Sequence, residues 1–226
     1  MPEPARIAVL ASGGGSNLQA ILDHFDSLGA NAPGRVVLVT SNRDDAGSLD
    51  RARNRGIAAI VALSEATGRL HALLHEYKID LIVLAGYLRM IPPEVIREYE
   101  NRIVNVHPAL LPKFGGKGMY GRHVHQAVID AHERVSGVTV HLVTQEYDTG
   151  PILAQWPVAV LPTDDAESLA HRVLVAEHAL YPRVVACLAA GDRARFPLKP
   201  PPRYFEHPPV TEAVIASDIR SAFENR

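Results

Sequence analysis

The chain has 226 residues, of which 47% are hydrophobic, so it can bury the core of one domain, with or without an appendage. A net charge of -2 and the absence of a sustained Lys/Arg stripe argue against a nucleic-acid partner. The amino terminus lacks a signal-peptide pattern, and no apolar run approaches the length of a membrane span. We therefore expect a soluble, cytoplasmic protein with no membrane partner.

The first predicted strand, Arg6 to Leu10, leads directly into the glycine loop Ser12-Gly13-Gly14-Gly15-Ser16-Asn17 and then into a helix-like stretch. A loop of this kind lets the backbone approach an anion and presents free amides at a helix start. It lacks the Gly-Lys-Ser/Thr ending of an ATP loop, and Leu18 stands where a dinucleotide loop has its third glycine. We expect a phosphate monoester rather than NAD or ATP. A tight turn that binds nothing is the alternative.

Apolar runs and helical stretches alternate through the next part of the chain. Strands are predicted at 36–40, 57–63, 80–85 and 103–107, and helices at 47–55, 69–77 and 94–100. The run at 80–85 has no polar alternation, as expected for a strand that is covered on both faces. The fold class is therefore predicted to be α/β, with a doubly wound, mostly parallel, Rossmann-like sheet.

The strand at 103–107 carries an amide and an imidazole at its end. Asn105 and His107 are two residues apart, so their side chains should point to the same side. Pro108 then turns the chain out of the sheet, at the place where open α/β sheets hold their sites. Asparagine can donate to a developing oxyanion and histidine can exchange a proton near neutral pH, which suits formyl or acyl transfer. Tying down a loop is the alternative role.

The following segment, 113–121, is rich in glycine and is expected to be a mobile surface loop, either a lid or a plain connector. Next to it, His123 and His125 have no carboxylate or cysteine at ligand spacing, so no metal is expected. Cys187, the only cysteine, is expected in the core.

The second half of the chain predicts a helix at 124–132 and strands at 137–143 and 152–160, with Asp148 in the turn between the two strands. That carboxylate could reach a neighbouring strand end, or could serve only the turn. A long helix is predicted at 164–190, with Asp164 or Asp165 as its cap and a bend or break at Pro182.

A change of composition separates residues 1–191 from a proline-rich extension, 192–226, which ends in a short helix at 210–223. The extension is expected to pack on the domain or to be partly disordered.

Five motifs in this order carry a resemblance to a known family. They are Ser12–Gln19, Ala85–Ile91, Asn105–Pro112, Gly137–His141 and Asp148–Pro151. Together they resemble the phosphoribosylglycinamide formyltransferase family over roughly Arg6 to Gly191. The resemblance implies a fold of the formyltransferase type, with 1–191 as the formyltransferase domain.

The resemblance also implies roles for individual residues. Asn105, His107 and Asp148 would be catalytic, and the charge of Asp148 would raise the pKa of His107. Glu177 would contact the glycinamide portion of the substrate. The substrate phosphate would be bound by Gly15, Ser16 and Asn17. The folate would be bound by Leu88, Arg89, Met90, Ile91, Asn105, Thr144, Gln145, Glu146, Tyr147 and Asp148.

The implied reaction transfers the formyl group of 10-formyltetrahydrofolate to the amine of glycinamide ribonucleotide in de novo purine biosynthesis. The reduced folate is a co-substrate, no metal is implied, and the chain would be a monomer or a homodimer. Two features depart from the family pattern. The segment before Arg69 cannot be aligned to a folate-contacting arginine of the family, and the loop at 113–122 is longer than in some members.

Three alternatives remain open at this point. A relative with the same Asn, His and Asp could hydrolyse 10-formyltetrahydrofolate or formylate methionyl-tRNA. The hydrolase is expected to carry an additional amino-terminal domain and the tRNA enzyme a larger carboxy-terminal one. A phosphate-ligand binding protein without enzyme activity would need only the glycine loop.

Overall fold

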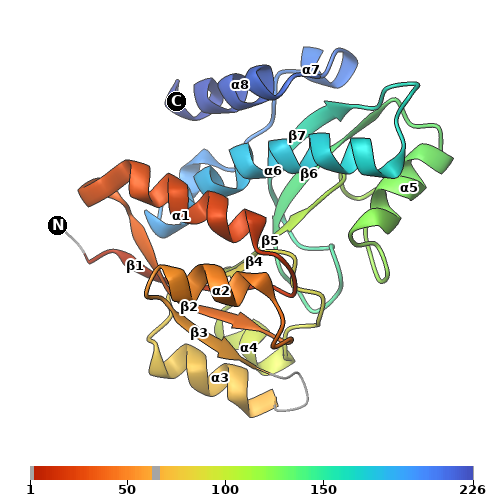
Figure 1. The fold of residues 1–226 in the computed structure, drawn as a ribbon. Coiled ribbons are helices and arrows are strands. Elements are labelled where there is room, and N and C mark those ends of the chain that lie inside the picture. The colour runs from red at the N-terminus through yellow and green to blue at the C-terminus, as the bar shows by residue number, and fades with distance from the viewer. Residues whose placement is uncertain (1–2, 63–66, 226) are drawn as a thin grey trace. The chain divides into compact units, whose positions relative to one another are not determined.

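The computed structural model describes residues 3–62 and 67–225 (Figure 1). The end of the strand predicted at 57–63 and most of the segment before Arg69 lie outside these residues. The chain forms two compact units, which we call unit 1 and unit 2. Unit 1 runs to Asn105 and includes Val185–Arg193, and unit 2 contains Val106–Val184 and Ala194 onwards.

Unit 1 is built on parallel strands in the order β3-β2-β1-β4-β5. The strands are β1 (Ala5–Leu10), β2 (Gly34–Ser41), β3 (Ala58–Val61), β4 (Leu81–Leu84) and β5 (Ile103–His107), whose last two residues belong to unit 2. The helices are α1 (Ser16–Leu28), α2 (Gly47–Asn54), α3 (Thr67–Glu76) and α4 (Pro93–Glu98), with a short 3-10 turn at Gly29–Asn31. This order of elements confirms the parallel α/β prediction, with boundaries moved by a few residues.

The core of unit 1 lies in its central strands, which explains why they could be found in the sequence. The residues Ile7–Leu10 of β1 and Ile82–Val83 of β4 are fully buried. A strand that is covered on both faces needs apolar side chains at every position, and its sequence therefore shows an uninterrupted run. On one side of β2, α1 and α2 lie next to each other (Figure 1).

The register of these strands brings three chain segments to one edge of unit 1. Leu10 of β1 pairs with Leu84 of β4, and Leu84 in turn pairs with Asn105 of β5. The strands are parallel, so the glycine loop after β1 and the loop after β4 leave the sheet at the same edge, beside Asn105. This is the edge at which open α/β sheets bind ligands.

Unit 2 contains an antiparallel pair and the C-terminal helices. Strands β6 (Val135–Leu142) and β7 (Ile152–Ala159) form the pair. The helices are α5 (Arg122–Asp130), α6 (Ala166–Ala189, with its last residues in unit 1), α7 (Arg203–Glu206) and α8 (Glu212–Glu224), and a 3-10 turn lies at Arg193–Arg195. No helix among residues 3–62 and 67–225 has the length and hydrophobicity required to cross a bilayer.

Two sequence predictions on α6 need correction. The helix is continuous through Pro182, where we expected a bend or break. Proline removes one backbone donor from this turn, and the guanidinium of Arg183 donates to the carbonyl of Ala179 at 2.7 Å, so the adjoining carbonyl keeps a partner. Cys187 is half-buried rather than in the core.

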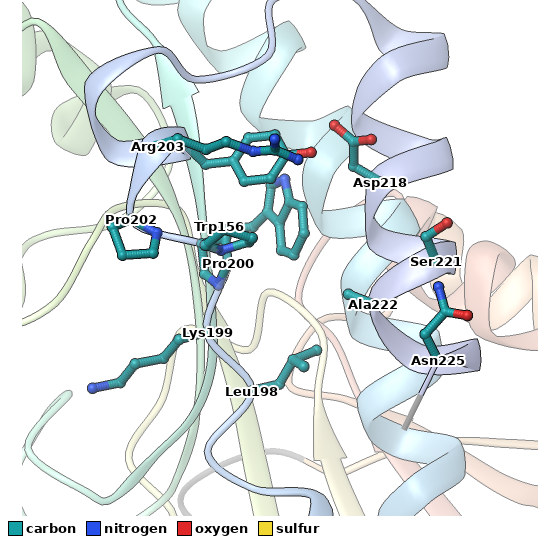
Figure 2. Close-up of a pocket in the computed structure, with 12 residues that line it drawn as sticks. Trp156, Leu198, Lys199, Pro200, Pro202, Arg203, Asp218, Ser221, Ala222 and Asn225 are labelled. Atoms are coloured by element: carbon teal, nitrogen blue, oxygen red, sulfur yellow. The ribbon is translucent and has the colours of Figure 1, made fainter.

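The C-terminal extension contributes ordered structure to unit 2. Leu198 pairs with Ala154 of β7, and the ring of Tyr204 lies 5.5 Å from that of Trp156. The extension and Trp156 together line an open cavity of about 580 Å³ (Figure 2). Figure 2 shows Asp218 and Ser221 of α8, and Asn225 directly after it, along one side of this cavity. Within unit 2, residues of the extension therefore contact β7.

At the start of α6, the two candidate caps have different roles. Asp165 is the cap, because its Oδ1 accepts from the backbone amides of Glu167 and Ser168 at 3.1 and 2.8 Å. Asp164 instead pairs with Arg172 through two 2.8 Å hydrogen bonds, and its side chain is only 3% exposed. The hydrogen bonds from Arg172 hold the pKa of the Asp164 carboxyl below its ordinary value.

Replacing Asp164 with asparagine is expected to lower the free energy of unfolding by about 2 to 4 kcal/mol near pH 7, because a buried guanidinium loses its countercharge. The folded-state pKa of Asp164 is depressed, so this stabilisation is present above the ordinary carboxyl pKa and is lost as pH falls through the folded-state value. Urea unfolding at pH 7 and near pH 3 measures both effects. Asp45→Asn is the control, since the Arg43–Asp45 pair is exposed and its loss should leave stability unchanged. Equal destabilisation by the two variants would contradict the prediction.

Candidate active site

The glycine loop of unit 1 starts α1 in a backbone conformation that suits glycine. Gly15, which directly precedes α1, has φ 75° in the left-handed region. A Cβ added there would lie 2.8 Å from the Cα of Ser48. Both the backbone conformation and the lack of space therefore disfavour any residue other than glycine. The loop therefore presents the amides at the start of α1 at the sheet edge, as the sequence predicted for an anion site.

Two side chains hold this loop in place. Arg51 of α2 donates to the carbonyl of Gly14 at 2.7 Å. The hydroxyl of Ser12 donates to Asn42 at 2.5 Å and accepts the amide of Leu88 at 2.9 Å. Ser12 thereby connects the glycine loop to the loop that follows β4.

The loop after β4 carries exposed apolar side chains next to a buried one. Leu88 and Met90 are 50% and 55% exposed, whereas Ile91 is buried. Exposed apolar side chains beside a glycine loop can contact a flat ring system without moving the core. Unit 1 thus brings together the predicted phosphate residues, the folate segment 88–91 and Asn105 at one sheet edge.

In unit 2, His107 at the end of β5 is held by the backbone of the loop that follows it. The ring is buried, and its Nε2 lies 2.8 Å from the carbonyl oxygen of Phe114. A carbonyl can only accept, so Nε2 carries the hydrogen in this contact. Nδ1 is the nitrogen that remains available for proton exchange, and it lies 3.5 Å from Oδ2 of Asp148.

Asp148 is the centre of the polar cluster in unit 2. Its Oδ2 accepts the amide of Gly116 at 2.9 Å, and its Oδ1 lies 3.4 Å from Nε2 of His141. The backbone at Asp148 has φ 57°, a left-handed conformation that costs on the order of 1 kcal/mol or more for a residue with a side chain. The hydrogen bond from Gly116 and the contacts with His107 and His141 hold the carboxylate in this position.

His141 is the member of this cluster that the sequence did not reveal. It appeared in the Gly137–His141 motif without a role, and the structure places it on β6 with 2% exposure. Its Nδ1 lies 2.9 Å from the carbonyl oxygen of Leu142 and donates to it, and its Nε2 faces Asp148. The alternation of β6 was the available signal, because it places a polar ring where the neighbouring residues are buried and apolar.

The pKa of His107 differs from the sequence expectation. Burial lowers the pKa of His107 below its ordinary value, and the Asp148 charge and the Phe114 carbonyl, which act in the opposite direction, only partly offset it. We expected Asp148 to raise this pKa. The charge of Asp148 does act to raise the pKa of His107, but burial of the imidazole lowers it by more, so the pKa lies below its ordinary value.

Asp148 itself is ionised at neutral pH. Burial acts to raise the pKa of its carboxyl, but the hydrogen bond from His141, the charge of His107 and the amide of Gly116 together outweigh burial and hold the pKa below its ordinary value. A neutral imidazole beside a carboxylate can accept a proton and then be stabilised as imidazolium. The cluster can therefore take up and release one proton at Nδ1 of His107.

The glycine-rich segment 113–121 is partly built into this cluster. Phe114 and Gly116 supply the backbone partners of His107 and Asp148. A Cβ on Gly115 would lie 2.5 Å from the Leu111 side chain and 3.2 Å from the Asp148 Cβ, so the chain passes close to the site. The first part of this loop is therefore neither a separate lid nor a plain connector, the two roles that we considered.

His123 and His125 do not form a metal site in the described part of the chain. His123 is exposed and its ring stacks on Tyr120, whereas His125 is buried in α5. Burial lowers the pKa of His125 to about 4, with the charge of His107 as the second cause. A neutral imidazole near His107 adds no positive charge to the cluster.

The remaining predicted site residues also lie in unit 2. Thr144 and Thr149 close the turn after β6, with their hydroxyls hydrogen-bonded to each other at 2.9 Å and both within 3.3 Å of the carbonyl oxygen of Glu146. Gln145, Glu146 and Tyr147 between them are exposed residues, and Tyr147 is 41% exposed. Glu177 is buried in α6.

The parallel strands, the glycine loop before α1 and the His107–Asp148 pair define an α/β protein of the doubly wound class with an acid–base site. The chain belongs to the formyl transferase family, whose model matches residues 5–185.

Comparison with known proteins agrees with this family. The chain is 45% identical over 195 residues to a chloroplastic phosphoribosylglycinamide formyltransferase of Arabidopsis thaliana, a match covering 83% of this chain and 66% of the plant protein. It is 39% identical to the Escherichia coli phosphoribosylglycinamide formyltransferase, covering 82% and 87% of the two chains. The chain therefore spans just under two thirds of the plant relative.

The fold is also similar to solved structures. The crystal structure of glycinamide ribonucleotide transformylase 1 from Symbiobacterium toebii matches with a TM-score of 0.77 and 39% identity, covering 83% of this chain and 89% of that one. The mostly parallel α/β fold predicted from the sequence is the fold of these formyltransferases.

Proposed function

We propose that this protein transfers the formyl group of 10-formyltetrahydrofolate to the amine of glycinamide ribonucleotide, giving formylglycinamide ribonucleotide and tetrahydrofolate. The observation that carries the proposal is the His107–Asp148 pair, placed at the end of β5 two residues after Asn105. The relatives named for the same reaction support it, over most of this chain's length.

The proposed roles follow the chemistry of the groups. Asn105 donates to the formyl oxygen as it becomes an oxyanion. His107 exchanges the proton that must move from the attacking amine to the departing folate nitrogen. Asp148, ionised and facing Nδ1, stabilises the imidazolium that forms during this exchange.

The proposed reaction consists of attack by the amine, a proton transfer and the departure of the folate nitrogen. The neutral amine attacks the formyl carbon, forming a C–N bond and moving the carbonyl electron pair onto oxygen. The nitrogen that attacked loses a proton to His107, directly or through water. The bond between the formyl carbon and the folate nitrogen then breaks, and that nitrogen takes the proton from the imidazolium. A His107 that is neutral at rest, as its lowered pKa implies, is suited to the first proton transfer.

Binding roles are assigned from both units. Gly15, Ser16 and Asn17 hold the substrate phosphate, and Glu177 contacts the glycinamide portion. The folate is bound by Leu88, Arg89, Met90, Ile91, Asn105 and the segment Thr144–Asp148. The exposed apolar side chains after β4 and the exposed residues 145–147 support these folate assignments. No metal takes part in the proposed reaction.

The proposal extends to the organisation of the chain. Residues 1–191 are assigned as the formyltransferase domain and 192–226 as an extension that packs on it, supported by the pairing of Leu198 with Ala154. A cytoplasmic location and a monomeric or homodimeric state stay predictions.

The test is to mix the purified protein with 10-formyltetrahydrofolate, with and without glycinamide ribonucleotide, and to follow folate deformylation by absorbance. Turnover that requires the ribonucleotide is the expected result. Turnover without it would identify a hydrolase instead. No turnover in either mixture would overturn the enzyme assignment for this substrate pair and favour a binding protein or another acceptor.

Replacing Gly15 with alanine is expected to raise the KM for glycinamide ribonucleotide about 10- to 100-fold, the worth of one or two charge-assisted hydrogen bonds. The added methyl group meets Ser48 and the left-handed backbone disfavours it, so the amides at the start of α1 lose their alignment. Steady-state kinetics at saturating folate measures the change. Gly13→Ala is the matched control, because a Cβ there has no neighbour within 4 Å. An unchanged KM in Gly15→Ala would remove the loop from phosphate binding.

A further inference from the structure

A cluster of three potential metal ligands lies on the surface of unit 1 and contains none of the residues assigned to the reaction. His71 and His75 are four residues apart on α3, so they share one face of the helix. Glu98, near the end of α4, points its carboxylate between the two rings. Among the residues that the structure describes, this is the group of His, Cys, Asp or Glu whose ligand atoms converge, all within 4.8 Å of one another.

The three side chains of the cluster lie within hydrogen-bond distance of one another, and one of the contacts is shorter than an ordinary hydrogen bond. Nε2 of His71 lies 2.5 Å from one oxygen of Glu98, and Nε2 of His75 lies 2.9 Å from the other. The two Nε2 atoms are 3.3 Å from each other. An ordinary N–H···O bond is about 2.7 to 3.2 Å long, so the contact between His71 and Glu98 is tighter than usual.

These separations are close to those of ligands around one ion. Zn²⁺ binds imidazole nitrogen at about 2.0–2.1 Å in tetrahedral geometry, which places neighbouring ligand atoms about 3.4 Å apart. The 3.3 Å between the two imidazole nitrogens fits this spacing, and small rotations of the exposed Glu98 side chain bring its oxygen to the same separation. A fourth position faces solvent, because the three side chains are between 35% and 57% exposed.

The ligand set also indicates which ions fit. Two imidazoles and one carboxylate favour divalent transition metals such as Zn²⁺, Cu²⁺ and Ni²⁺ over Mg²⁺ and Ca²⁺, which prefer oxygen ligands alone. Two neutral rings with their hydrogens on Nδ1 and one carboxylate carry a charge of -1, which a divalent cation overcompensates. In the absence of metal, the carboxylate holds the two rings by hydrogen bonds from Nε2.

We propose that His71, His75 and Glu98 bind a divalent transition-metal ion of the Zn²⁺ class, with water in the remaining position. The site joins α3 to α4, two helices on either side of β4 in sequence, and its ligands are separate from the proposed catalytic residues. Its expected effect is on the stability of unit 1, because an ion that binds only the folded state stabilises it.

The experiment uses the full chain, stripped with a chelator and then titrated with Zn²⁺ against a chromophoric competitor. We expect about one tightly bound equivalent, and at least about tenfold weaker binding in each of His71→Gln, His75→Gln and Glu98→Gln. Two matched controls keep full affinity. His171→Gln replaces a helical histidine outside the cluster, and His107→Gln replaces the proposed catalytic histidine.

A second readout does not depend on the variants. Co²⁺ added to the unmodified chain should give the visible absorption of a low-coordinate nitrogen and oxygen site, and Zn²⁺ should displace it. The proposal is overturned if the unmodified chain binds no Zn²⁺, if the three cluster variants bind it as well as the unmodified chain does, or if His107→Gln abolishes binding. Formyl transfer activity does not enter any of these readouts, so the site and the proposed function fail independently.

Discussion

Replacing His107 with glutamine is expected to lower kcat for formyl transfer by about 100- to 10,000-fold, the usual contribution of a positioned acid–base group. The amide of glutamine can still donate to the Phe114 carbonyl, so the loop after β5 keeps a partner. It cannot carry a proton from the attacking amine to the departing nitrogen. Steady-state kinetics with both substrates measures the loss.

The KM values separate catalysis from folding in this variant. A residue that acts only on the transition state changes kcat and kcat/KM together and leaves KM nearly unchanged. His123→Gln is the control, because His123 is an exposed histidine of unit 2 whose ring lies edge-on to that of Tyr120. If His107→Gln retains more than about a tenth of the normal kcat, His107 is not the proton carrier.

Replacing Asp148 with asparagine is expected to lower kcat on the order of 100-fold and to lower the pKa of His107 further. In the unmodified protein, burial already holds this pKa below its ordinary value, and the Asp148 charge works against burial. Without the negative charge of Asp148, the effect of burial on the pKa of His107 is no longer partly offset, so the imidazolium becomes harder to form. The amide keeps an oxygen that can accept from Gly116, which preserves the loop.

The pKa part of this prediction can be measured directly by following the His107 ring signals by NMR as a function of pH. The titration midpoint should lie below the ordinary histidine value in the unmodified protein and lower still in Asp148→Asn. A midpoint that rises, or does not move, would show that the Asp148 charge does not act on His107. Asp130→Asn, an exposed carboxylate on α5, should leave the midpoint unchanged.

The sequence could predict the elements whose side chains are uniform in character. Residues Ile7–Leu10 of β1 and the whole of β4 are apolar because both faces are covered, and the alternation of strands with helices then specifies a parallel sheet. Pro182 misled the prediction because the helix rule is local, whereas α6 is held by buried residues on either side of the proline. Tertiary packing outweighed the loss of one hydrogen bond.

The site was only partly predictable, for a different reason. Asn105 and His107 share one strand, so their spacing carries information. His141 lies 34 residues after His107, so no local sequence pattern relates the two residues. They come together only in the folded chain, where Asp148 contacts both rings. Likewise, the four-residue spacing of His71 and His75 was visible, but Glu98 joins them only through the packing of α3 against α4. The net direction of the His107 pKa also depends on burial, which no motif reports.

The polar cluster around His107 is held to a large extent by main-chain atoms, namely the carbonyls of Phe114 and Leu142 and the amide of Gly116. Every amino acid except proline supplies these groups, so natural variation at position 114 can alter the side chain without altering the partner of His107. A change in the number of residues between 107 and 116 has no such freedom, because it moves the carbonyl and the amide away from the ring and the carboxylate. In homologues and in engineered libraries, substitutions at position 114 should therefore be tolerated far better than insertions or deletions between 107 and 116.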